Sequence, residues 1–307
     1  MSPLIDALER YLRMRRGFGF KLETQELRLR NFVAFMGERG ADVVTGKLAI
    51  EWAGGGCGPA TWSSRLSTIR PFARHLANID PRTEIPPHGV FPPQRRPRPY
   101  IYTDREIADL LAAMRALPPS DGLKRWTYHC FFGLLAVAGL RFSEATNLRR
   151  EDVDLDSGVL TIRDTKFGKT RLVPIDPTTV AVLAAYAVRR DVCPKRRANP
   201  CFLVGDRGAK LHHANIHRVF IAWTRQVGLR GPTTRKGPRV HDLRHSYAVR
   251  TLVSWYRAGE DVERLLPVLT TYLGHTHTRD TYWYLSASPE LISHAATRLE
   301  ARWEMVS

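Results

Sequence analysis

Residues 159–176, which decide the fold class, read VLTIRDTKFGKTRLVPID. The two ends of this segment, VLTIR and TRLVPID, are rich in β-branched and apolar residues, and they flank the glycine-containing stretch DTKFGK. Such a pattern predicts a β-hairpin over residues 159–175. Because most of the remaining chain shows helical spacing, we expect a mainly α protein with one small antiparallel sheet, of the α+β class.

Helical signals surround the hairpin from residue 101 onward. Thr103 and Glu106 have the spacing of a capping box, which predicts a helix start. The apolar run over residues 126–140 is too short to cross a bilayer and predicts a buried core helix. Asp176 followed by Pro177 is a typical start for the helix after the hairpin. Further helices are expected over 178–190, 214–227 and 242–258, an interruption at Pro267 within 261–273, and a capped amphipathic helix within 286–307.

The N-terminal part has a separate pattern. Apolar residues at spacings of three and four over residues 1–80 predict a small four-helix unit. Residues 79–100 then contain seven prolines and no periodicity. Since proline disfavours helix on its N-terminal side, we expect an extended basic linker over 81–100, the alternative being a surface loop of one large domain. A catalytic domain is expected over 101–285.

The charge is the strongest compositional fact. The 47 Lys and Arg residues against 30 Asp and Glu residues give a formal net charge of +17. This balance favours a nucleic-acid partner, although an anionic membrane surface or a ribosomal partner would suit it as well. The four cysteines form no CxxC motif, so neither a zinc knuckle nor a disulfide framework is expected. We find no secretion leader and no membrane span, and we expect a cytoplasmic, nucleoid-associated protein.

Four short segments carry polar residues that fit one reaction. They are AGLRFSE with Arg141, TKFGKTR with Lys166 and Lys169, HDLRHSYA with His241 and Arg244, and LGHTHTRDTYWYL with His275, Tyr282 and Tyr284. Each has an ordinary structural interpretation when taken alone, such as a core-edge arginine or hairpin-tip lysines. Together they suit phosphoryl transfer from DNA, because arginine pairs bind phosphate oxygens and a tyrosine oxygen can attack phosphorus.

These segments, in this order, resemble the boxes of the tyrosine recombinases, or phage-type integrases. AGLRFSEATNLRREDVDL resembles the first arginine box, TKFGKTRLVPI the lysine hairpin, HDLRHSYA the His-x-x-Arg box and YLGHTHTRDTYWYL the closing box. The match covers most of residues 100–285, and the N-terminal helices resemble the core-binding domain of the family. The resemblance implies a helical DNA-binding domain and a mixed catalytic domain that together form a C-shaped clamp around DNA.

The resemblance also implies roles for six residues. Arg141 and Arg244 would bind the scissile phosphate, His241 and His275 would position it, and Lys166 would protonate the leaving 5′-oxygen. The family lysine lies five residues before the arginine of the Arg-x-Val-Pro segment, which favours Lys166 over Lys169. The nucleophile follows the box histidine by nine residues and a threonine by three, which selects Tyr284 and leaves Tyr282 as a packing residue.

Several expectations accompany this reaction. A 3′-phosphotyrosyl intermediate keeps the bond energy, so neither ATP nor a metal cofactor is expected, and the partners are double-stranded DNA and further copies of the chain, a dimer per site and a tetramer in synapsis. A mobile-element enzyme is favoured. Further DNA contacts are predicted at four basic residues: Arg65, Arg70, Lys169 and Arg171.

Other interpretations stay open at this point. A type IB topoisomerase uses similar residues, and a non-catalytic DNA-binding protein could share the fold. His213 and His217 have the i, i+4 spacing of a metal-ligand pair, but no third ligand is evident, and structural or DNA-contact roles are favoured. The helix within 286–307 would dock on a neighbouring protomer or pack on its own domain.

Overall fold

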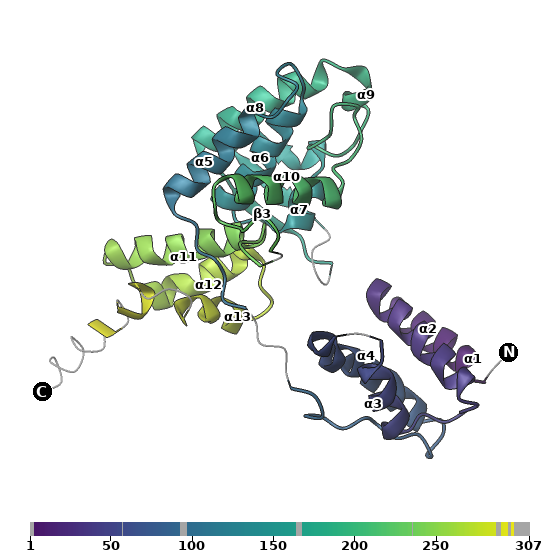
Figure 1. The fold of residues 1–307 in the computed structure, drawn as a ribbon. Helices are drawn as coiled ribbons and strands as arrows, with labels where there is room; N and C mark the ends of the chain where they lie inside the picture. The colour runs from purple at the N-terminus through teal and green to yellow at the C-terminus, as the bar shows by residue number, and fades with distance from the viewer. Residues whose placement is uncertain are drawn as a thin grey trace, which may run out of the picture. The chain divides into compact units, whose positions relative to one another are not determined.

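The computed structural model describes residues 3–56, 58–92, 97–163, 168–234, 236–286, 290–293 and 296–297. It divides into two compact units, Met1–Pro97 and Arg98–Ser307. Figure 1 shows both units.

Four helices form the first unit, as predicted. They are α1 (Pro3–Gly17), α2 (Glu23–Glu38), α3 (Gly46–Gly54) and α4 (Pro59–Ala77). The residues that recur every three or four positions point inward. Leu12, Phe32 and Phe72 are completely buried in one apolar core, which all four helices share. Burial of these side chains is the main contribution to the stability of so small a unit.

The proline-rich segment after α4 does not behave as a free linker over its first half. The Glu84 carboxylate accepts a hydrogen bond of 2.6 Å from the backbone amide of Gly46 at the start of α3. The Phe91 ring packs 5.3 Å from the Trp62 ring, measured between centroids. Proline excludes helix but permits an extended chain, and this chain has side chains that find partners on α3 and α4. The division between the two units falls at Pro97, within the segment 81–100 that was expected to be the linker.

The second unit is mainly helical and contains one small antiparallel sheet, which confirms the predicted fold class. Its elements, in chain order, are α5 (Asp104–Arg115), α6 (Lys124–Val137), α7 (Phe142–Asn147), η1 (Arg150–Asp152), β1 (Val153–Asp154), β2 (Val159–Ile162), β3 (Arg171–Pro174), α8 (Pro177–Asp191), α9 (Pro194–Arg197), α10 (His213–Gln226), α11 (Asp242–Arg257), α12 (Val262–Leu273), α13 (Arg279–Tyr282) and η2 (Trp283–Ser286).

The sheet has the strand order β1-β2-β3. Strand β2 pairs with β3 in the register that places Val159 opposite Pro174 and Ile162 opposite Arg171. The hairpin was predicted, whereas β1 was not. A strand of two residues is too short to show the alternation of apolar and polar residues that predicts a strand. Helix α8 begins as expected, with the Asp176 carboxylate accepting a hydrogen bond from the amide of Thr178 and Pro177 in the first turn.

Helix α6 provides the centre of the main core. Phe131 and Phe132 are completely buried, and residues of α5, α8 and α10 pack around this helix (Figure 1). The Thr103–Glu106 capping box that starts α5 is present as predicted. The C-terminal end of α6 leads through Gly139 directly into α7, so the central helix of the core presents the first arginine segment.

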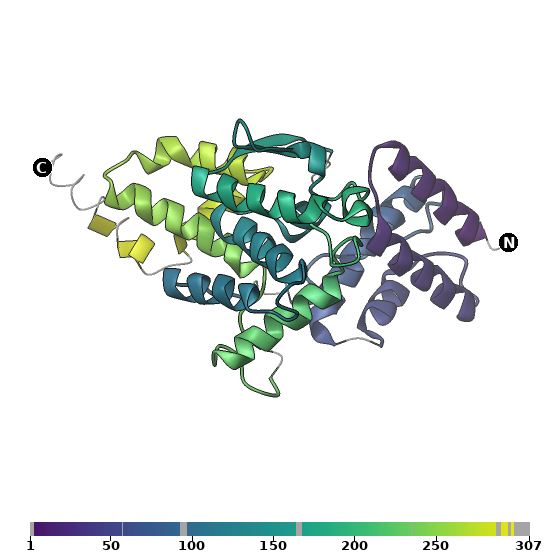
Figure 2. The ribbon, with the colours of Figure 1, turned by 90° about the horizontal axis from the view of Figure 1, so that it is seen from above.

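A second, smaller core lies between α11, α12 and η2. Leu252, Leu273 and Tyr284 are among its buried members. In Figures 1 and 2 the two long helices run side by side at the end of this unit that leads to the C-terminal segment. Pro267 does not interrupt α12, contrary to expectation. Pro267 is exposed, while Leu266 and Leu269 on the opposite side of the helix are buried. The packing of these leucines therefore outweighs the one backbone hydrogen bond that proline removes.

The predicted helix within 286–307 lies mostly outside the described residues. Residues 290–293 are helical, Leu291 is completely buried against the smaller core, and Glu290 pairs with Arg257 of α11 at 2.9 Å from its Nε. The beginning of this segment therefore packs on its own unit. Within the described part of the chain, no helix is both long enough and apolar enough to span a membrane.

Candidate active site

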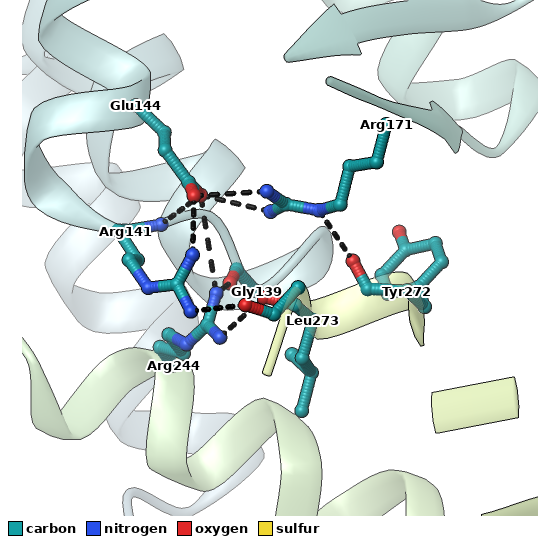
Figure 3. A network of polar contacts seen from close by, with 8 residues as sticks. Gly139, Arg141, Glu144, Arg171, Arg244, Tyr272 and Leu273 are labelled. Atoms are coloured by element: carbon teal, nitrogen blue, oxygen red, sulfur yellow. Dashed lines mark hydrogen bonds and ion pairs between the residues drawn. The ribbon is translucent and has the colours of Figure 1, made fainter. Parts of the chain in front are cut away.

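One buried carboxylate organises the predicted site. Glu144 lies in the first turn of α7, three residues after Arg141, and only 5% of its side chain is exposed. Its oxygens accept hydrogen bonds from the backbone amide of Arg141 at 2.8 Å and from the Arg141 guanidinium at 2.7 Å (Figure 3). Arg141 also donates from Nη2 to the carbonyl of Gly274 at 2.6 Å, which ties α7 to the end of α12.

Two further arginines converge on the same carboxylate. Arg171 of β3 donates both terminal nitrogens to the two Glu144 oxygens at 2.9 and 2.8 Å, a bidentate pair. Arg244 of α11 places Nη1 3.9 Å from Glu144 and donates to the carbonyls of Gly139 and Leu273, both at 2.6 Å. Figure 3 shows the three guanidinium groups around Glu144. Residues from α7, β3 and α11 are thereby fixed in one cluster.

The cluster carries excess positive charge. Three guanidinium groups face one carboxylate, so two positive charges are not compensated within it. Burial alone would raise the pKa of Glu144, but the hydrogen bonds and charge of Arg171, with those of Arg141, lower it to about 2. Burial and the neighbouring Arg141 lower the pKa of Arg244 to about 10, which still leaves it protonated at neutral pH. An anion placed here would be stabilised.

The arginines differ in exposure. The side chain of Arg141 is 27% exposed, against 1% for Arg244. Arg141 is thus the cation of this cluster that solvent or a ligand reaches most readily. The prediction of Arg171 as a DNA contact does not fit its environment, because its guanidinium is held by Glu144 and by the carbonyl of Tyr272 at 2.8 Å. Arg171 links the hairpin to α12 instead.

The two predicted histidines flank the arginines. His241 is the N-cap residue of α11, and its ring centroid lies 4.6 Å from that of His245. His275 follows α12, and its Nδ1 is hydrogen bonded at 2.8 Å to the hydroxyl of Thr281. Thr281 is completely buried and contacts the Thr270 hydroxyl at 2.9 Å, so two threonines fix the ring orientation of His275. Burial and the charge of Arg244 lower the pKa of His275 to about 4.

Tyr284 lies beside these residues and is 2% exposed. Its ring stacks on that of His275 with centroids 6.0 Å apart, and its hydroxyl is 3.0 Å from Nδ1 of His245. Tyr282 is 52% exposed. The two tyrosines face opposite ways, as their spacing predicts, but the expectation that Tyr282 packs is wrong. Tyr284 packs because its ring closes the core between α11 and α12.

The family is established by sequence comparison. The model of the phage integrase family matches residues 101–290, more than half of the chain. The chain belongs to the phage integrase family. The protein named integrase/recombinase y4rB of Sinorhizobium fredii is 49% identical over 99% of both chains. The tyrosine recombinase XerD of Caulobacter vibrioides is 30% identical over 78% of this chain and 74% of its own. The chain is therefore a tyrosine recombinase.

Solved structures share the fold. The Tn1549 transposon integrase in complex with transposon right end DNA has a TM-score of 0.66 at 15% identity, covering 96% of this chain and 98% of its own. The XerH site-specific recombinase bound to a difH substrate also gives 0.66, at 18% identity, covering 91% and 80%. At this level of identity the likeness concerns the fold alone.

Of the two candidate lysines, Lys166 and Lys169, the structure describes one. Lys166 lies outside the described residues. Lys169 is exposed, just before β3. Arg171, which served to count back to Lys166, is anchored to Glu144, so the C-terminal strand of the hairpin is attached to the arginine cluster.

Two arginines of the first unit were also predicted to contact DNA. Arg70 is 9% exposed and donates to the carbonyls of Pro86 and Pro87 at 2.9 and 2.6 Å. This guanidinium holds the proline-rich segment on α4, so the prediction of a DNA contact is not supported for it. Arg65 is half-buried, with its guanidinium 3.9 Å from the Trp52 ring centroid. The Arg65 side chain is partly exposed to solvent.

The histidine pair of α10 is packed against an aromatic ring. The His213 and His217 rings lie 4.2 Å apart, and Phe142 packs against both. Among the residues that the structure describes, no three His, Cys, Asp or Glu side chains are grouped so that they could hold a metal ion.

Sequence reasoning missed Glu144 and His245. Both had a signal, since Glu144 is three residues after Arg141 on a short helix and His245 is four after His241. The spacing indicates neighbours within each helix. It does not indicate that Arg171 or Tyr284, far along the chain, would complete these contacts.

Proposed function

We propose that this recombinase cleaves and rejoins double-stranded DNA at specific sites, with Tyr284 as the nucleophile. The observation that carries the proposal is the convergence of Arg141 and Arg244 beside the rings of His275 and Tyr284. The two positive charges of these arginines are only partly compensated by the one negative charge of Glu144. A phosphodiester carries one negative charge and gains more negative character on the transferred oxygens, which such a cluster stabilises. Arg141, the more exposed arginine, is the one that a phosphate would meet first.

The reaction has two balanced halves. The phenolic oxygen of Tyr284 forms a bond to phosphorus and loses its proton, while the bond from phosphorus to the 5′-oxygen breaks and that oxygen gains a proton. We assign the proton that the 5′-oxygen gains to Lys166 as general acid. We assign His241 and His275 to hydrogen bonds with the phosphate oxygens and to taking up the proton that Tyr284 loses. A 5′-hydroxyl of another strand then attacks the 3′-phosphotyrosyl bond and releases the enzyme.

The partners follow from charge and family. A net charge of +17 suits a DNA backbone, and the structures with the same fold are described as complexes with transposon right end DNA and with a difH substrate. We propose that copies of this chain assemble as a dimer on each site and a tetramer in synapsis, and that the protein is associated with the nucleoid. The likeness to integrases, one of them from a transposon, supports a role in a mobile element.

The two units have different proposed tasks. We propose that the unit Met1–Pro97 binds DNA as a core-binding domain, with Arg65 among its contacts, and that Arg98–Ser307 is the catalytic domain. Lys169, which is exposed just before β3, is a further proposed phosphate contact.

Single-hydroxyl variants test the nucleophile. Wild-type protein incubated with a duplex that carries its site should give a DNA adduct resistant to SDS. Tyr284→Phe should abolish the adduct, and Tyr282→Phe should leave it unchanged, because the exposed Tyr282 makes no part of the arginine site. The reverse result would refute the assignment. A substrate with two sites adds the reaction type, since strand transfer supports recombination and relaxation alone supports a topoisomerase.

A further inference from the structure

We infer that His245 is a positioning residue for the nucleophile, holding the phenolic oxygen of Tyr284 through its Nδ1. The inference rests on the proposed role of Tyr284. The distance between Nδ1 and the phenolic oxygen is 3.0 Å, a normal hydrogen bond. His245 belongs to the HDLRHSYA segment, directly after Arg244, but the roles assigned to this segment leave it without one.

The ring of His245 is itself fixed on several sides. Its centroid lies 5.4 Å from that of Trp283, at an interplanar angle of 61°, and 4.6 Å from that of His241, at 80°. The ring of Tyr284 is held in turn by stacking on His275. The phenol is thus oriented twice, by His275 at its ring and by His245 at its oxygen. A nucleophile fixed in this way starts close to its attacking geometry.

The charge state of His245 suits the acceptor role. Burial, followed by the neighbouring His241, Arg239, Arg244 and His275, lowers its pKa to about 3, so the imidazole is neutral at physiological pH. With its proton on Nε2, the neutral ring accepts the phenolic hydrogen at Nδ1. The lone pairs of the Tyr284 oxygen then point away from His245.

Three substitutions separate positioning from simple packing. His245→Leu replaces the imidazole by an apolar side chain of similar size and so removes the Nδ1 acceptor. His245→Asn puts an amide oxygen close to the position of Nδ1, whereas His245→Gln puts one close to that of Nε2. A matched control is His212→Asn, at the exposed N-cap position of α10 and outside the arginine cluster. Each protein is tested on a nicked duplex that loses its short 5′-hydroxyl fragment after cleavage, so that one turnover traps the adduct.

We expect His245→Leu to slow cleavage about 100-fold, as for other misplaced reacting groups. His245→Asn should recover most of this loss, His245→Gln should not, and His212→Asn should match the wild type. DNA affinity and the thermal unfolding midpoint should stay unchanged in all four. Equal rates in the wild type and His245→Leu would overturn the inference. So would equal slowing in all three His245 variants, accompanied by lower unfolding midpoints, because this is the signature of a packing residue.

A second substrate isolates the nucleophile side of the reaction. When sulfur replaces the bridging 5′-oxygen, the leaving thiolate needs no proton. Cleavage by Lys166→Ala should recover on this substrate, and cleavage by His245→Leu should stay slow. Recovery of His245→Leu would place this residue on the leaving-group side and overturn the inference. If Tyr284→Phe still forms an adduct, the proposed function fails instead, whatever the His245 variants do.

Discussion

At the scale of single residues, Glu144 has the environment with the largest consequences. It is an acidic residue in the proposed phosphate site, where it neutralises part of the charge of three arginines. Removing one partner of a buried ionic network leaves the others without compensation, which is more costly than the network itself is stabilising. Glu144 therefore holds the three arginines together in the proposed phosphate site.

Glu144→Gln should lower the free energy of unfolding by roughly 3 kcal/mol at pH 7, the loss typical of a broken buried ion pair. The pKa of Glu144 is depressed in the folded protein, so its contribution is fully present above about pH 4.5 and is lost as the pH falls toward 2. Urea unfolding should therefore show the wild type and Glu144→Gln converging in acid. Glu151→Gln, at an exposed ion pair, is the control and should change stability by less than about 1 kcal/mol. A difference that persisted at low pH would contradict the electrostatic explanation.

At the scale of elements, two glycines allow the backbone to come close to the arginines. Gly139 and Gly274 both have positive φ. The carbonyl of Gly274 accepts a hydrogen bond from Arg141, and the carbonyls of Gly139 and Leu273 accept hydrogen bonds from Arg244. A Cβ on Gly139 would lie 2.6 Å from the Tyr247 ring, and one on Gly274 would lie 2.8 Å from Nη1 of Arg171. These helix ends can approach the cluster only without side chains.

Gly274→Ala and Gly259→Ala form a matched pair. Both glycines follow a helix with φ near +70°, but an added Cβ on Gly259 meets nothing within 4 Å. Gly259→Ala should cost about 1 kcal/mol of stability from backbone strain alone. Gly274→Ala should cost more and should also slow DNA cleavage, because it displaces Arg171 from Glu144. Equal losses of stability, with cleavage unaffected by either change, would show that the contact with Arg171 does not matter.

Local signals were sufficient for many elements. The capping box at Thr103, the Asp176 cap and the hairpin depend on residues close together in sequence, and each was predicted. Contacts across long separations could not be foreseen. Arg141 reaches Gly274 over 133 positions, and Arg244 reaches Gly139 over 105. The burial of Tyr284 and the packing of residues 79–91 on the first unit depend on such contacts, and so does the continuity of α12 through Pro267.

At the scale of the whole molecule, the histidines beside the arginine cluster should make the unit Arg98–Ser307 sensitive to acid. His245 and His275 are held neutral, with pKa values of about 3 and about 4, well below the ordinary value near 6.5. At pH values between about 4 and about 6.5, these histidines bind protons in the unfolded chain but not in the folded chain. The linkage relation then requires stability to fall as the pH decreases from about 6.5 toward 4.

The free energy of unfolding should therefore be lower at pH 5 than at pH 7.5, by at most about 2 kcal/mol for each of these two histidines. Urea unfolding at the two pH values measures this difference. The double variant His245→Asn with His275→Asn should reduce the dependence on pH, and His277→Asn, at an exposed position, should not. A double variant with the same dependence as the wild type would assign the acid sensitivity to other groups.

The position of Tyr284 also has a consequence for engineering this enzyme. The same side chain is a buried member of the core between α11 and α12 and the proposed attacking group. Selection for thermostability commonly fills and tightens such cores. Around Tyr284 such changes would raise the melting temperature but shift the phenolic oxygen from the position that His245 and His275 hold. Stabilised variants selected without an activity screen should therefore be enriched in slow recombinases. Stabilising changes are better sought in the first unit, whose core contains no part of the arginine site.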